Sequence, residues 1–196
     1  GRGKNFSGSA GVEVNYGAAP DLQLTLAAPM AYSHDGGRWR WGAGDLELSA
    51  KYRFYHDEQA GFSVAVFPGV TLPTGTNGMS AGKVTALLRL WGQKDIGPWS
   101  VFGGGGYAIN PGAGNRDYWT GGIAVTRNFG ERLQLGVEAN RNGVRTPDGS
   151  ASTGLSIGAT YQCKVPIRVF VSGGPTFEDV GGPTGFHGFA ALGFKF

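Results

Sequence analysis

The sequence predicts an all-β protein: a transmembrane, antiparallel, up-and-down β-barrel of about 12 strands, of which about 11 lie in this chain. Two patterns predict this fold. Apolar and polar residues alternate with a period of two along almost the whole chain, which is typical of strands with two different faces. Short and long connections alternate between these segments, as they do at the two ends of a membrane barrel.

Composition agrees with this fold class. The 196 residues include 37 glycines, which disfavour long helices, and only 16% are charged. No run of eighteen apolar residues occurs, so a membrane-spanning helix is excluded. A chain of this length forms one compact domain, and residues 1–196 are therefore expected to make a single barrel.

The clearest strand lies at residues 46–55. Leu46, Leu48 and Ala50 begin one face, and Glu47, Ser49 and Lys51 begin the other. Segments of this kind are about ten residues long, which suits a tilted transmembrane strand. Their expected centres are residues 13, 25, 48, 66, 86, 103, 123, 136, 157, 170 and 191. A soluble β-sandwich also alternates and is the alternative for each strand taken singly.

Aromatic residues near the ends of the apolar rows favour the membrane. Tryptophan and tyrosine gather at both interfaces of a membrane barrel. The expected interface anchors are Trp39, Trp41, Trp99 and Trp119. Trp39 and Trp41 alternate with Arg38 and Arg40 in a stretch interpreted as an outer loop, where the arginines would meet lipid phosphates or simply be exposed.

Loop lengths predict the orientation of the chain. Long connections rich in Gly, Pro, Asn and Asp are expected at 33–44, 73–82, 110–117, 142–152 and 178–185, and short turns lie between them. Short turns face the periplasm in bacterial barrels, so the last strand, 186–196, ends there. With an even strand count and both termini in the periplasm, one further strand is expected before Gly1, unless one strand has been miscounted.

The polar rows place charged side chains in the interior of the barrel. The expected lumen residues are Glu13, Glu47, Lys51, Arg53, Lys83, Arg89, Glu138 and Arg168. Basic residues outnumber acidic ones in this set, so an open pore is expected to favour anions. Opposite charges that pair across neighbouring strands would instead fill the interior, and the sequence leaves the conducting and the plugged state open.

Other classes of function are not supported. The formal charge of +3 is not gathered into basic runs, so no nucleic-acid partner is expected. The single cysteine, Cys163, excludes a disulfide and a cysteine-rich metal knuckle. No serine and histidine stand at a catalytic spacing, and we expect neither an enzyme, nor a metal site, nor a cofactor. The glycine run 103–106 lacks the features of a phosphate loop and is interpreted as strand bending or close packing against a bulky inward side chain.

Three segments resemble known proteins. The end of the chain, residues 188–196, is similar to the assembly signal of outer-membrane barrels, with Leu192, Phe194 and Phe196 as its apolar positions. Residues 44–54 (GDLELSAKYRF) and 69–75 (GVTLPTG) resemble the outer-membrane family of the putative meta-pathway of phenol degradation. The resemblance implies a channel or transporter of the bacterial outer membrane that admits hydrophobic or aromatic compounds.

These observations lead to two hypotheses. The first is passive diffusion of small molecules through a polar, mildly basic lumen. The second is a plugged structural barrel that docks or anchors a partner protein assembly in the outer membrane. In both, the expected partners are outer-membrane lipid, lipopolysaccharide and the barrel-assembly machinery.

Overall fold

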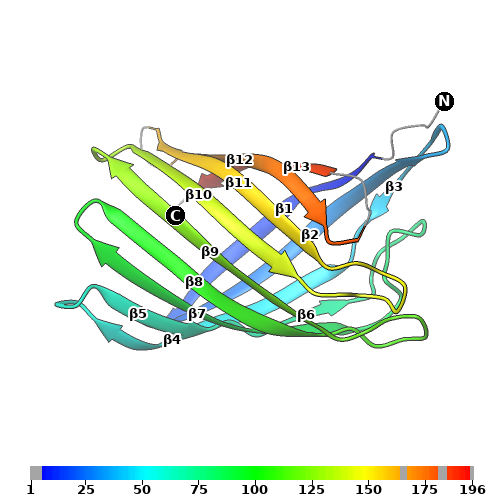
Figure 1. Cartoon of the computed structure of the whole chain (residues 1–196), viewed down its shortest axis with the longest axis horizontal. Coiled ribbons are helices and arrows are strands. Elements are labelled where there is room, and N and C mark those ends of the chain that lie inside the picture. The colour runs from blue at the N-terminus through cyan, green and yellow to red at the C-terminus, as the bar shows by residue number, and fades with distance from the viewer. Residues whose placement is uncertain (1–5, 164–166, 181–184, 195–196) are drawn as a thin grey trace.

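The computed structural model describes residues 6–163, 167–180 and 185–194 (Figure 1). They form one antiparallel sheet of thirteen strands. The strands are β1 (Phe6–Ala19), β2 (Leu22–Asp35), β3 (Arg38–Ala43), β4 (Leu46–Asp57), β5 (Phe62–Val66), β6 (Gly69–Leu72), β7 (Thr85–Ile96), β8 (Trp99–Ile109), β9 (Tyr118–Phe129), β10 (Leu133–Asn142), β11 (Ser152–Gln162), β12 (Ile167–Glu178) and β13 (Gly185–Phe194). None of the described residues forms a helix long and apolar enough to cross a membrane.

Two pairs of these strands are halves of one crossing. β3 and β4 pair with successive stretches of β2, and β5 and β6 both lie between β4 and β7. Gly44 and Asp45 interrupt the first crossing, and Phe67 and Pro68 interrupt the second. Pro68 has no N–H to donate to a ladder, which explains the second break. The described residues therefore cross the sheet eleven times, and the eleven predicted centres all fall on these crossings.

The connections define two ends of the sheet. The short-turn end carries the turns at 20–21, 58–61, 97–98 and 130–132, and the long-loop end carries the loops at 73–84, 110–117 and 143–151. This asymmetry agrees with the predicted up-and-down order.

One predicted loop was wrong. Residues 33–44 form a hairpin, because β2 continues to Asp35 and β3 begins at Arg38. Gly36 and Gly37 have φ values of 56° and 79°, and glycine adopts this left-handed conformation without a steric penalty. Two such residues in succession make the tight turn that antiparallel hairpins favour. The Arg–Trp alternation was therefore that of a strand.

Apolar side chains cover the outer face of the sheet. Val12, Ile157 and Trp119 are about two-thirds exposed or more, and similar residues follow along most strands. In the described part of the chain, the buried hydrophobic residues are Ala65 and Ala108 alone. A β-sandwich would bury its aliphatic rows between two sheets, so this distribution excludes that alternative.

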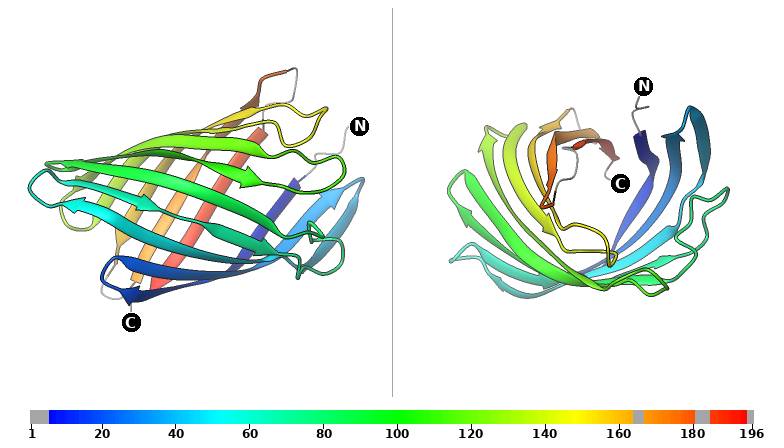
Figure 2. Two further views of the ribbon diagram at one scale, coloured as in Figure 1. Left: turned by 90° about the horizontal axis from the view of Figure 1, so that it is seen from below. Right: turned by 45° about the vertical axis from the view of Figure 1, so that its right-hand side comes forward.

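The sheet curls on itself, with β1 and β13 at its two edges (Figure 2). No ladder joins these two strands among the described residues. Because ten antiparallel pairings separate them, β1 and β13 run in the same direction. An antiparallel closure would need a further strand between them, and the strand expected before Gly1 stays a prediction.

Candidate functional site

The interior faces of β1 and β2 carry a hydrogen-bonded polar ladder. Asn15 and Thr25 lie opposite each other in the register, on the face away from the exposed Val12 and Val14. The Asn15 amide donates to a Glu13 carboxylate oxygen at 2.7 Å, and its own carbonyl oxygen accepts from Gln23 at 2.7 Å and from the Thr25 hydroxyl at 2.6 Å. Paired polar groups of this kind keep the side chains of this wall ordered.

Arg89 of β7 is held in place beside this ladder. Its guanidinium lies 3.5 Å from a Glu47 carboxylate oxygen and 5.0 Å from the centre of the Phe67 ring. Phe67 follows the outward Val66 at the break between β5 and β6, which turns its ring to the interior. The carboxylate and the aromatic face both stabilise the cation, so Arg89 has a defined position on the wall.

These groups surround an interior cavity of about 420 Å³. Its wall includes Glu13, Asn15, Gln23, Thr25, Glu47, Ser49, Lys51, Phe67 and Arg89. Within the described ranges Lys51 forms no ion pair, whereas Arg89 is paired with Glu47. Lys51 is therefore the cation of this cavity that is available to a solute.

The wall next to Arg89 is made of glycine. Gly104 and Gly106 of β8 lie opposite Trp91 and Arg89 of β7 and share their inward face. A Cβ at Gly104 would lie 2.2 Å from the Leu90 carbonyl oxygen, so this position accepts no side chain. The glycine run thus lies against two bulky inward residues, and backbone replaces side chains over this part of the interior.

The other predicted lumen residues lie outside this cavity. Arg53 pairs with Asp21 at 2.7 Å near the short-turn end, and the Arg168 guanidinium donates to Gln162 at 3.2 Å. Glu138 borders a smaller interior cavity of about 70 Å³. Lys83 lies in the loop before β7, because β7 begins only at Thr85. Its ammonium group lies against Gly112 of the next long loop. The structure thus brings together Glu13, Glu47, Lys51 and Arg89.

Sequence reasoning missed a group of three interior residues on β11 to β13, in which one histidine contacts two hydroxyl groups. The Ser156 hydroxyl lies 2.8 Å from Nε2 of His187, and the Thr176 hydroxyl lies 3.0 Å from Nδ1. Within the described ranges both partners of the ring are hydroxyls, so no carboxylate orients it as in a catalytic triad. The residues are far apart in sequence, and in the register His187 of β13 lies opposite Gly174 of β12, which carries no side chain between His187 and β11. No sequence motif signals this arrangement.

This chain is similar to a known protein family and to a solved structure. The family described as "Putative MetA-pathway of phenol degradation" matches residues 4–195. The chain belongs to this family. A crystal structure of an outer-membrane channel from Pseudomonas putida F1 is similar with a TM-score of 0.74 and 14% identity, over 95% of this chain and 79% of that one. No curated protein matches. The family and the all-β fold predicted from the sequence are therefore confirmed.

The two segments that resemble this MetA family meet at the long-loop end. Asp45, at the break between β3 and β4, accepts hydrogen bonds from the backbone N–H groups of Gly75 at 2.9 Å and Ala81 at 2.8 Å. Gly42 lies on the inner face of the sheet, and the Thr76 carbonyl oxygen is so close to it that a Cβ at this position would clash. The loop at 73–84 therefore folds against the inner face of the sheet and is fastened there by Asp45.

We expect Asp45→Ala to release this loop. Hydrogen bonds to a charged acceptor contribute about 1.5–3 kcal/mol each, so the loss of two should raise trypsin cleavage at Lys83, in the same loop, about tenfold or more. Mass spectrometry of timed digests measures the rate. Asp35→Ala removes a carboxylate at the same end of the sheet and should leave cleavage unchanged; an equal effect in both variants would contradict the fastening role.

An ion pair at the same end of the sheet joins β10 to the residue that follows β12. Arg141 of β10 forms a bidentate ion pair with Asp179, just after β12. The hydrogen bond from Arg141 lowers the pKa of the Asp179 carboxyl below its ordinary value, so the pair stays charged at neutral pH.

The predicted interface anchors lie at both ends. Trp39 and Trp41 on β3, and Trp119 on β9, are exposed near the long-loop end, while Trp99 begins β8 at the short-turn end. Trp119 packs on Tyr107 with ring centroids 4.8 Å apart. Of the expected assembly signal, Leu192 and Phe194 are exposed on the outer face of β13, and Phe196 lies outside the described residues.

Proposed function

We propose that this protein is a passive channel of the bacterial outer membrane that passes small molecules through a polar, mildly basic lumen. The observation that carries the proposal is the interior cavity of about 420 Å³ between the polar ladder and Arg89. Gly104 and Gly106, which lie opposite Trp91 and Arg89, add no side chains of their own to the interior beside this cavity. Size and charge, without chemistry, would then select what passes.

Aromatic or partly hydrophobic compounds are the proposed solutes. Phe170 and Phe189 on the inner faces of β12 and β13 pack with ring centroids 5.5 Å apart, and Phe67 borders the main cavity. Such rings offer contact area to an apolar solute, while Lys51 offers a cation to an acidic one. The description of the family, which refers to phenol degradation, is consistent with a solute of this class.

The outer-membrane location implies further partners. We propose that the exposed apolar rows contact lipid, that the long-loop end meets lipopolysaccharide, and that β13 is read by the barrel-assembly machinery. Leu192 and Phe194 support the last proposal because both side chains project from the outer face of this edge strand.

A plugged barrel that docks a partner assembly is the competing function. The loop fastened by Asp45 favours it, because this loop occupies part of the inner face near Gly42. Single-channel recording in planar lipid bilayers separates the two functions. We expect the purified, folded protein to give discrete conductance steps in 1 M KCl; a sealed bilayer with folded protein would contradict the channel and leave the docking function.

A further inference from the structure

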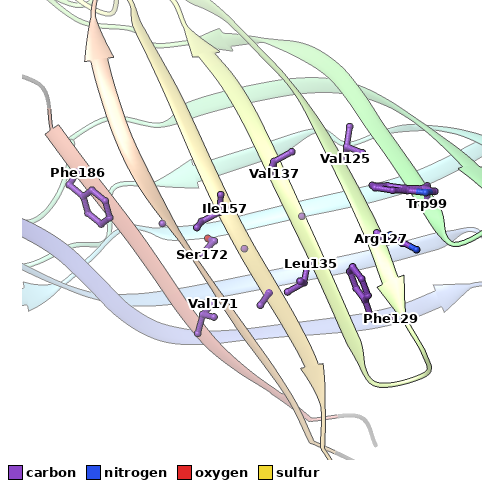
Figure 3. Close-up of a pocket in the computed structure, with 14 residues that line it drawn as sticks. Trp99, Val125, Arg127, Phe129, Leu135, Val137, Ile157, Val171, Ser172 and Phe186 are labelled. Atoms are coloured by element: carbon purple, nitrogen blue, oxygen red, sulfur yellow. The ribbon is translucent and has the colours of Figure 1, made fainter.

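The outer face of β9 to β12 carries an apolar groove of about 740 Å³ (Figure 3). Val125, Val137, Ile157 and Val171 stand along it, and Phe186 lies at one side. Gly173 lies on the outer face and adds no side chain to the groove, and the backbone of Gly136 and Gly158 forms part of its floor. The groove lies on the opposite side of the sheet from the interior cavities, so a solute in the lumen does not reach it.

A cation stands at the short-turn end of this groove. Arg127 is exposed on the outer face of β9, two residues before the strand ends at Phe129. Its guanidinium lies 5.2 Å from the centre of the Trp99 ring and 4.8 Å from that of Phe129. Across the ranges that the structure describes, no carboxylate pairs with it.

The position of Arg127 calls for an anion from outside the protein. A positive charge on the outer wall of a membrane barrel is costly away from the interface, and aromatic girdles mark the depth of the lipid headgroups. Trp99 and Phe129 hold the guanidinium at this depth and leave its N–H groups free for a phosphate, which arginine binds well. The apolar groove begins where the acyl chains of the same lipid would start.

We propose that this groove binds one glycerophospholipid, with the phosphate on Arg127 and an acyl chain along Val137 and Ile157. Charge complementarity commits the site to a phosphate-bearing lipid, and the short-turn end places it in the leaflet expected to be periplasmic. The lipid occupies the outside of the barrel, so the proposal is independent of whether the lumen conducts.

Native mass spectrometry of the purified protein tests the proposal. The probes are dioleoyl phosphatidylglycerol and dioleoylglycerol, which share their acyl chains and differ in the phosphate headgroup. We expect the wild type to keep the phospholipid adduct through detergent exchange about tenfold more than the phosphate-free lipid. Arg127→Gln should abolish this preference.

A second variant tests the acyl-chain part of the site. Ala159 lines the groove on the outer face, so Ala159→Phe should fill it and lower phospholipid retention about tenfold without adding a polar group to the membrane. Ala139→Phe is the control for Ala159→Phe, because it adds the same ring to the outer face outside the groove. Arg145→Gln is the control for Arg127→Gln, because it removes a guanidinium that lies over the Tyr118 ring near the long-loop end. Both controls should bind as the wild type does.

Equal retention of the two lipids, or equal phospholipid retention in the wild type, Arg127→Gln and Ala159→Phe, would overturn the proposal. The migration of unheated samples in gels confirms that each variant is folded before it is compared. Conductance is not the readout, so a negative result would leave the channel proposal unaffected.

Discussion

Gly104→Ala is expected to lower the free energy of unfolding by about 2 kcal/mol, because overpacking of a tight site costs about 1–3 kcal/mol. The added Cβ would lie 2.2 Å from the carbonyl oxygen of Leu90 and 2.9 Å from the Cα of Trp91. Both atoms belong to the neighbouring backbone, so the strand itself must move. Urea unfolding in lipid vesicles, followed by tryptophan fluorescence, measures the change.

Gly103→Ala is the matched control. Its Cβ would point to the outer face, 3.8 Å from the Gly122 carbonyl oxygen and 3.9 Å from Ile123, which are ordinary contacts. Alanine also restricts the unfolded chain, so this variant should be as stable as the wild type or slightly more stable. Equal destabilisation by the two substitutions would show that the loss of glycine flexibility, rather than the inward clash, sets the stability.

Arg89→Glu should turn the ion preference of the channel towards cations. The change of two charge units, about 7 Å from a passing ion in water, contributes about 1 kcal/mol before salt screening. We therefore expect the cation-to-anion permeability ratio to rise about fivefold. Reversal potentials in a KCl gradient across a planar bilayer measure this ratio.

The same substitution on the opposite face controls for net charge. Arg127→Glu changes the charge of the protein equally, but its side chain stands on the outer wall. Its permeability ratio should match that of the wild type. A conducting barrel in which Arg89→Glu shifts the ratio no more than Arg127→Glu does would remove Arg89 from the permeation path.

The sequence was most informative where one face of a strand meets lipid. Alternation such as that of Leu46, Glu47 and Leu48 reports the two environments directly, which is why the eleven crossings were found. It was least informative at 33–44, where Gly36 and Gly37 suggested a loop although two glycines also make the tightest hairpin turn. Lys83 was expected in the lumen because the alternation of β7 was continued back to it, whereas β7 begins only at Thr85.

The sequence by itself determined which side chains share a face, because successive residues of a strand point to opposite sides. Only the tertiary structure decided which of them meet: Arg89 with Glu47 and Phe67, His187 with Ser156, and Asp45 with the loop that contains Gly75. Those contacts depend on register, on strand breaks and on the curl of the sheet, which arise from pairings between distant segments and leave no periodic trace in the chain.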